Sequence, residues 1–275
     1  MRLQVIEPIK IRDKILGGTA PLVCIPIVAK DRRELELQAG DAVIHCPDVI
    51  EWRVDYFDDA CDPEKVLLAL RLIRSIIGEI PIIFTFRSSL EGGNMEVDDD
   101  IRYEIIEKAI NTKKVDVIDI ELISGKTNIR RIKAATVKQN IPLILSYHNF
   151  KETPSVEFML DKMKEQVLNG ADIAKIAVMP KDEEDVLNLL SATLKARKEM
   201  PGTPLITMSM DELGVITRIA GGVFGSDLTF GACGKNSAPG QISVVELREA
   251  MKTVYGGSIY NSASFTSTDY AVPDY

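Results

Sequence analysis

The sequence has little of what marks exported, disulfide-bonded or zinc-binding proteins. It contains four cysteines with no CxxC pair among them, and only two histidines. This spacing suggests neither a disulfide framework nor a zinc site. The first residues lack the long apolar segment of a signal peptide, and no run reaches the roughly 18 apolar residues of a membrane span. We expect a cytoplasmic protein that needs no metal and no cofactor.

A basic surface is also missing. The formal net charge is -8 and the sequence pI is about 5.0. Because binding to nucleic acid or to an anionic membrane depends on clustered Lys and Arg, neither partner is expected. An anionic small molecule would have to be bound by a few local cations.

What the sequence does contain is a regular alternation of apolar runs and amphipathic helical patterns. The expected strands are residues 21–28, 48–54, 80–86, 115–122, 141–147, 171–178, 204–210 and 223–230. The helices expected after them are residues 32–38, 63–77, 98–110, 128–138, 155–168, 183–198, 213–219 and 244–254. Eight such units predict an α/β protein with a closed (β/α)₈ TIM barrel, and an open doubly wound sheet is the alternative.

The domain organisation follows from the same pattern. Residues 1–255 are expected to form a single (β/α)₈ domain, because barrels of about 250 residues commonly fold as one unit. Residues 3–16 precede the first core strand and predict a short N-terminal hairpin or an irregular lead-in. Residues 256–275 are rich in Gly, Ser, Thr and Tyr, and we expect them to form a flexible C-terminal tail.

Lys175 is the most unusual residue of the pattern. It lies within the apolar run 171–180, which has no acidic residue beside the lysine. A strand buried on both faces leaves a lysine without solvent, and burial lowers the pKa of an amine toward the range in which it is nucleophilic. The ordinary alternative is a lysine at a strand end that reaches solvent.

Charged residues recur near the ends of the other expected strands. Period two places Glu51, Arg53 and Asp55 on one face of their strand and the apolar residues on the other. Further candidates are Arg87 after the third strand, Asp119 and Glu121 in the fourth, and His148 in the fifth. Barrel enzymes carry their reactive groups at the carboxyl ends of the strands, so these residues are expected to surround one site with Lys175.

Each of these residues also has a structural interpretation. Arg53 and Glu51 could form an ion pair inside the barrel, and Asp119 and Glu121 could neutralise the charge of Lys175. We favour that supporting role for the two acids. His45, the other histidine, precedes a strand and is interpreted as an ordinary connecting residue.

The last unit contains a segment rich in Gly, Ser and Ala, residues 225–241. Such a segment between a strand and a helix is typical of a mobile lid, with Ser237 and Gln241 as its hydrogen-bonding groups. Lys235 is expected to be solvated, since Asn236 follows it and no Walker A spacing precedes it. Arg218 adds a cation on the same side.

These motifs together resemble the type I 3-dehydroquinate dehydratases. The resemblance covers nearly the whole barrel and includes Glu51-Trp-Arg53, Phe86-Arg87, Glu91-Gly-Gly, Ser146-Tyr-His148, Ala174-Lys175, Met208-Ser-Met, Arg218 and Ser237-Ala-Pro-Gly-Gln241. It implies a metal-free barrel, usually a homodimer, that converts 3-dehydroquinate to 3-dehydroshikimate in the shikimate pathway of aromatic amino acid biosynthesis.

The resemblance also implies a role for each site residue. Lys175 would form a Schiff base with the substrate ketone, and His148 would act as general base and then general acid. Glu91 would orient the imidazole of His148 and raise its pKa. The residues implied to bind substrate are Glu51, Arg53, Arg87, Arg218, Ser237 and Gln241.

Two other functions remain open from the sequence. A class I aldolase of the transaldolase type also carries a lysine on a barrel strand, but it breaks carbon–carbon bonds. A non-catalytic barrel that senses a quinate-like metabolite is the second alternative. An assay for the conjugated enone product distinguishes both from a dehydratase.

Overall fold

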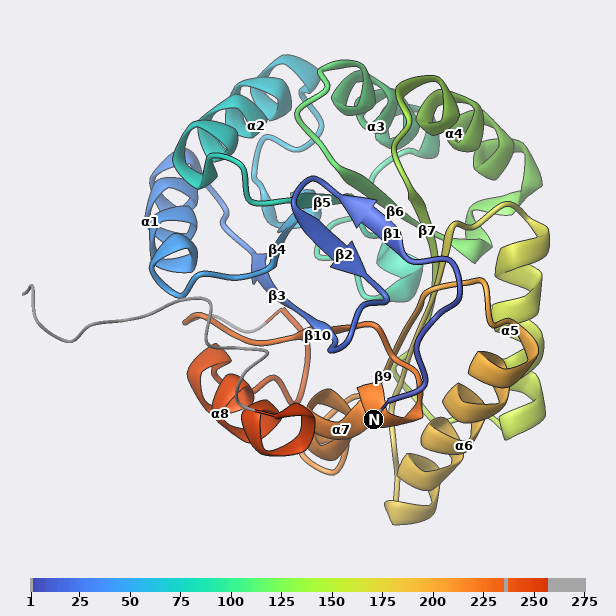
Figure 1. The fold of residues 1–275 in the computed structure, drawn as a ribbon. Coiled ribbons are helices and arrows are strands. Elements are labelled where there is room, and N and C mark those ends of the chain that lie inside the picture. Colours follow the sequence, from blue (N-terminus) through green and yellow to red (C-terminus); the bar gives the residue numbers. More distant parts are fainter. Residues whose placement is uncertain (1, 235–236, 257–275) are drawn as a thin grey trace, which may run out of the picture.

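The computed structural model describes residues 2–234 and 237–256. The strands of its main sheet are β3 (Leu22–Ile27), β4 (Val49–Arg53), β5 (Ile82–Thr85), β6 (Val117–Glu121), β7 (Leu143–Asn149), β8 (Ile173–Val178), β9 (Leu205–Ser209) and β10 (Leu228–Phe230). The helices that follow them are α1 (Arg32–Ile44), α2 (Pro63–Ile77), α3 (Asp99–Asn111), α4 (Gly125–Gln139), α5 (Val156–Leu168), α6 (Glu183–Glu199), α7 (Val215–Phe224) and α8 (Val244–Tyr255). Figure 1 shows these helices as a ring around the strands.

Within the described residues the eight strands form one parallel sheet that is nearly closed. Neighbouring strands follow the order β10, β3, β4, β5, β6, β7, β8 and β9. The remaining seam, between β9 and β10, is joined by a parallel bridge between Leu205 and Ser226 and by a 2.6 Å hydrogen bond from the Asp227 amide to the Leu205 carbonyl. This order never reverses, so the barrel prediction is confirmed and the open-sheet alternative is wrong.

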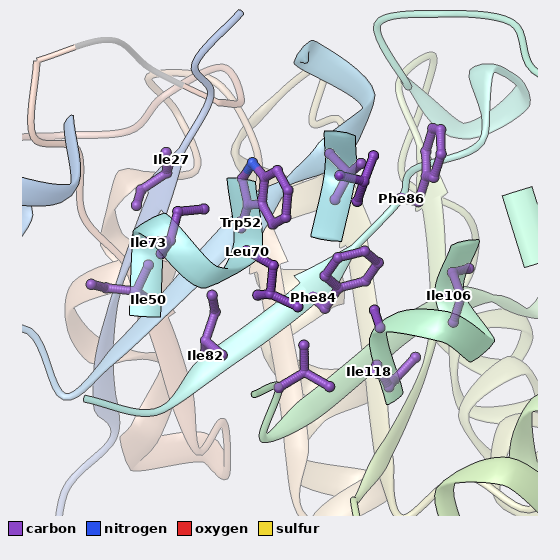
Figure 2. Close-up of a cluster of buried hydrophobic side chains, with 14 of the residues drawn as sticks. Ile27, Ile50, Trp52, Leu70, Ile73, Ile82, Phe84, Phe86, Ile106 and Ile118 are labelled. Carbon is purple, nitrogen blue, oxygen red and sulfur yellow. The ribbon is translucent and has the colours of Figure 1, made fainter. Parts of the chain in front are cut away.

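The outer face of the barrel is packed against the helices. Figure 2 shows Trp52 of β4 and Phe84 of β5 among aliphatic side chains such as Leu70 and Ile73 of α2. The Trp52 and Phe84 rings meet edge to face with centroids 5.5 Å apart. Trp52 points outward here, while Glu51 and Arg53 take the opposite parity, as the alternation predicts.

The amino-terminal end of the barrel is covered by the predicted hairpin. Strands β1 (Ile9–Ile11) and β2 (Lys14–Leu16) pair antiparallel and lie across this end of the barrel (Figure 1). Ile11 and Leu16 are buried in an apolar cluster with the inward residues at the start of the strands, including Val117 and Ile144. The hairpin therefore seals the end of the barrel that lies away from the charged residues.

The structure differs from the sequence prediction at residues 223–230. Val223 and Phe224 are the last residues of α7, and the strand is only Leu228–Phe230. A short apolar run does not by itself distinguish a helix end from a strand. Gly225, with φ +125°, ends the helix and donates its amide to Gly221.

Two sequence predictions concern parts of the chain at the limit of the structure. The expected flexible tail, residues 256–275, lies outside the described residues except for Gly256, and so does Lys235. Within the described residues, no helix is both long enough and apolar enough to cross a membrane.

Candidate active site

Lys175 is buried inside the barrel with 4% of its surface exposed. Its Nζ donates to Asp119 Oδ2 of β6 at 2.7 Å and lies 3.5 Å from Glu51 Oε1 of β4. The ring of Phe230 stands beneath the ammonium, with its centroid 5.0 Å from Nζ. The interpretation of Lys175 as a solvated strand-end residue is therefore wrong. Its charge is met by carboxylates from other strands.

His148 and Glu91 form a hydrogen-bonded pair beside the lysine. Glu91 Oε2 lies 2.9 Å from His148 Nδ1 and accepts the His148 backbone amide at 2.8 Å. Since one oxygen meets both nitrogens, we assign the ring proton to Nδ1, which leaves the lone pair on Nε2. The pairing implied by the resemblance is present in the structure.

The direction of the His148 pKa shift corrects an expectation. Burial, together with the positive charges of Arg87 and Lys175, lowers the pKa of His148 well below its ordinary value. Burial and the negative charge of Glu121 raise the pKa of Glu91 to about 8. The pKa of His148 is thus not raised as expected, because desolvation and the two cations dominate the net shift.

The short helix η2 (Ser89–Glu91) positions Glu91. The Ser88 hydroxyl accepts the Leu90 amide, and Gly92 ends the turn with φ +82°. A Cβ at Gly92 would lie 2.4 Å from the ring of Phe150, so glycine is required there for close packing as well as for backbone conformation.

Arg87 is buried and paired with two acids. Its guanidinium donates to Glu121 at 2.6 Å and to Asp119 at 3.0 Å. Glu121 also accepts from Arg102 of α3 at 2.7 Å. The expected support of Lys175 is therefore borne by Asp119, whereas Glu121 pairs with arginines.

Arg53 is likewise paired within its own segment. It donates to both oxygens of Asp55, at 2.9 and 2.8 Å. Glu51 instead accepts from the Thr85 hydroxyl at 2.9 Å. The interpretation of Arg53 and Glu51 as partners in an ion pair is thus wrong.

Arg218 of α7 differs from Arg53 and Arg87. Only 2% of it is exposed, and no salt bridge joins it to a carboxylate within residues 2–234 and 237–256. Its guanidinium donates to the Pro239 carbonyl at 2.9 Å and contacts Met208 Sδ at 3.8 Å. Burial lowers its pKa to about 10, which still leaves it charged at neutral pH.

The predicted lid residues are bonded to each other above the site. Gln241 accepts the Ser237 amide at 2.8 Å and donates to the Ser237 hydroxyl at 2.9 Å. Arg53 reaches the Ser237 carbonyl at 3.5 Å. Gly240, with φ +70°, lies so close to Asp211 that a Cβ would meet its carbonyl oxygen at 2.0 Å.

Eight of the nine predicted site residues line one cavity of about 40 Å³. They are Glu51, Arg53, Arg87, Glu91, His148, Lys175, Ser237 and Gln241. The ninth, Arg218, contacts Met208, which also lines the cavity. A space of this volume holds about one water, so a six-membered ring can enter only if the covering residues move.

Sequence reasoning missed several groups of this site. Ser146 accepts from Arg87 and donates to Asp119, both at 2.7 Å, and its position two residues before His148 was a usable signal. Phe230 was a second missed group, although the alternation of side chains along its strand places it on the inward face. Arg102 gave no such signal, because it reaches Glu121 from a helix outside the barrel.

The described residues contain no group of three or more His, Cys, Asp and Glu side chains arranged to hold a metal ion. The carboxylates at and around the cavity are engaged by Lys175, Arg87, Arg53, Thr85 and His148. The site is therefore built as a network of cations, acids and one histidine around a buried amine.

The fold and this network define a (β/α)₈-barrel enzyme with its ionisable groups at the carboxyl ends of the strands. The sequence model of the family described as type I 3-dehydroquinase matches residues 23–258. The chain belongs to this family, and the resemblance inferred from its motifs is confirmed.

Individual relatives agree with this assignment. A 3-dehydroquinate dehydratase of Listeria monocytogenes serotype 4b (strain F2365) is 43% identical over 245 residues, covering 89% of this chain and 97% of the relative. The structure of 3-dehydroquinate dehydratase from Geobacillus kaustophilus HTA426 has a TM-score of 0.89 at 41% identity and covers 92% of this chain and 98% of its own. The type I enzyme from Clostridium difficile, solved with covalently modified comenic acid, has a TM-score of 0.88 at 38% identity, with 91% and 98% covered.

Proposed function

We propose that this protein is a hydro-lyase that dehydrates 3-dehydroquinate to 3-dehydroshikimate through a Schiff base on Lys175. The observation that carries the proposal is the placement of the buried Lys175 amine and the His148–Glu91 pair on one cavity. The names of the relatives supply the substrate. The covalently modified comenic acid in the Clostridium difficile enzyme supports a covalent mechanism.

Imine formation is the first step. Lys175 adds to the substrate ketone and water leaves, so that an ammonium and a carbonyl become a protonated imine and water. The cationic nitrogen withdraws electrons from the neighbouring carbon and makes its C–H bond acidic. The buried surroundings keep bulk water from hydrolysing the imine early.

His148 then transfers one proton twice. Its Nε2 removes the proton from the carbon next to the imine, giving an enamine and an imidazolium. The same proton passes to the β-hydroxyl, which leaves as water while the imine and the new double bond form. A lowered pKa suits both steps, because His148 starts neutral and, once protonated, is a strong acid toward the leaving group. Hydrolysis of the imine frees the product and Lys175.

Substrate binding is assigned by which groups have spare hydrogen-bonding capacity. Arg218 is the buried cation without a carboxylate partner in the described structure, and we propose that it binds the substrate carboxylate. Glu51, Ser237 and Gln241 are proposed to bind hydroxyls because they line the same cavity as Lys175 and match the residues that the family resemblance implies for this role. Arg53 and Arg87, already paired with acids, would shape the site and contribute remaining N–H groups.

We further propose that residues 1–255 act as a single catalytic domain, that the enzyme is a homodimer in the cytoplasm, and that it serves the shikimate pathway and chorismate biosynthesis. Cysteines that are all free support a reducing compartment. Light scattering of the purified protein measures the subunit number directly.

The decisive experiment adds borohydride during turnover of 3-dehydroquinate while the conjugated enone is monitored by absorbance. We expect enone formation, inactivation and a substrate-derived mass on Lys175 that retains the intact carbon skeleton. A fragment of a cleaved substrate would indicate an aldolase, and binding without turnover would indicate a sensor. Label on a different lysine would defeat the proposal.

A further inference from the structure

Asp119 is the side chain closest to the reactive nitrogen. It is fully buried on β6, and its Oδ2 accepts from Lys175 Nζ at 2.7 Å and from Arg87 at 3.0 Å. Its Oδ1 accepts from the Ser146 hydroxyl at 2.7 Å. Three donors thus fix the position of both oxygens. Although burial alone raises the pKa of a carboxyl group, Arg87 and Lys175 hold the pKa of Asp119 well below its ordinary value, so the group stays ionised.

Glu51, the other carboxylate near Lys175, is held differently. It lies farther from Nζ, at 3.5 Å, and the Thr85 hydroxyl is the hydrogen-bond donor recorded for it in the described structure. It therefore keeps capacity for a substrate hydroxyl. Asp119, whose oxygens already have three donors, has little such capacity and faces the amine.

We infer that Asp119 is the counterion of the protonated imine formed on Lys175, and so a further catalytic residue of this enzyme. The inference rests on the proposed function. In forming the imine, the lysine ammonium loses two hydrogens with the carbonyl oxygen as water and keeps the third on nitrogen. The charge on that nitrogen is +1 before and after, so a carboxylate positioned for the ammonium is already positioned for the iminium.

The negative charge of Asp119 should affect the steps in which the nitrogen of Lys175 is positively charged. Proton removal by His148 converts the iminium to a neutral enamine, and loss of the hydroxyl restores the cation. Asp119 favours the cationic states that begin and end this sequence, whereas Arg87, which also pairs with Asp119, and the neutral His148 offer no negative charge. Glu51 is the remaining acid, and its distance makes it the weaker partner.

The test compares Asp119→Asn with Glu51→Gln, two nearly isosteric removals of one negative charge beside the same nitrogen. Both are assayed for kcat, KM and the rate at which borohydride attaches substrate-derived mass to Lys175 in the presence of 3-dehydroquinate. We expect Asp119→Asn to lower kcat and the labelling rate by about 10² to 10³, the size seen when one preorganised electrostatic group is removed. Glu51→Gln should act mainly through KM.

The outcomes separate this inference from the proposed function. Labelling of Lys175 in the unchanged protein, with a loss above tenfold in Asp119→Asn and a smaller one in Glu51→Gln, supports the counterion. A loss below tenfold in Asp119→Asn, or an equal loss in both variants, overturns it while the imine mechanism stands. No label on Lys175 in the unchanged protein overturns both.

Circular dichroism first establishes that Asp119→Asn is folded. If Asp119→Asn does not fold, Ser146→Ala is tested instead. That substitution leaves the charge of Asp119 in place but removes the hydroxyl that holds its Oδ1. A decrease of at least about threefold in labelling rate and kcat, with KM little changed, then supports the role of a fixed counterion. An unchanged labelling rate overturns it.

Discussion

The two ends of this barrel are built from the same strands but carry opposite chemistry. At the amino-terminal end, the inward residues are apolar and pack under the hairpin, as Val117 and Ile144 do. Two positions further along the same inward face stand Asp119 and Ser146, which belong to the network around Lys175. The alternation of side chains along a strand determines which residues point into the barrel. How far along the strand such a residue lies determines whether it belongs to the apolar core or to the active site.

The larger opening lies at the end without this network. A cleft of about 710 Å³ beside the hairpin is lined by Lys14, Asp48 and Arg248 among others, and Asp48 pairs with Lys14 at 3.9 Å and with Arg248 at 3.8 Å. The cavity at the catalytic end has a volume of only about 40 Å³. The volume of the two openings would have selected the wrong end as the active site, whereas the cluster of buried ionisable groups selects the right one.

The largest difference in kcat is expected from a lysine-to-alanine substitution made at each end of the barrel. Lys175→Ala should reduce kcat by at least about 10⁴, because no imine can form. Lys14→Ala, in the hairpin at the other end, should leave kcat within about twofold, as surface substitutions away from a site usually change little. Steady-state kinetics measure both. Substantial turnover by Lys175→Ala would mean that the barrel works without a covalent intermediate.

The two histidines provide the second contrast. His148→Ala should lower kcat by about 10² to 10⁴, the usual contribution of a general acid–base group, while borohydride still labels Lys175. The control is His45→Ala, since His45 lies at the end of α1 and contacts the Asp41 carbonyl and Cys233. Similar losses in the two variants would show that His148 has been misassigned.

The apolar end should respond in stability rather than in rate. Ile144→Ala removes a buried side chain under the hairpin and should lower the free energy of unfolding by about 2–5 kcal/mol, and Ile144→Val by about 0.5–1.5 kcal/mol. Denaturant unfolding measures both. Under conditions in which both variants are folded, their kcat should stay close to that of the unchanged protein. A large loss of kcat would contradict the assignment of stability to one end of the barrel and catalysis to the other.

The charged end should make stability depend on pH. Because the pKa of Glu91 is raised to about 8, its stabilising contribution is complete below its ordinary pKa and is lost as the pH rises toward 8. Between pH 6.5 and 8 the free energy of unfolding should fall more steeply in the unchanged protein than in Glu91→Gln, by up to about 1.4 kcal/mol per pH unit.

That pH window avoids the other titrating group of the pair. The lowered pKa of His148 stabilises the folded protein above pH 6.5, and this contribution is lost only as the pH falls below that value. Equal slopes in the unchanged protein and in Glu91→Gln would show that Glu91 is already ionised at pH 6.5.

The smallest expected effect is that of a chelator. Dialysis against EDTA should leave turnover unchanged, because the imine provides the electron-withdrawing group that a metal would otherwise supply. A loss that is restored by a divalent cation would contradict the covalent mechanism at the charged end.

The fold was predictable because its signals are local. Eight apolar segments that alternate with amphipathic ones along the chain predict eight strands with a helix after each, and so a barrel. The prediction was wrong at Val223 and Phe224, because a short apolar run there ends a helix rather than beginning a strand. Inward parity likewise predicted that Glu51, Arg53 and Lys175 would share the interior.

The barrel, the end that carries the chemistry and most of the residues that line its cavity could thus be predicted from the order of the residues alone. The support of Lys175 by Asp119 was expected from the sequence. The folded structure was needed to show that Glu121 pairs with two arginines instead, and that Arg218 has no acid as partner among the described residues. It also reversed the expected pKa shift of His148. The physical reason is that ion pairing and desolvation depend on distances of a few ångströms between residues far apart in the chain, which periodicity does not encode.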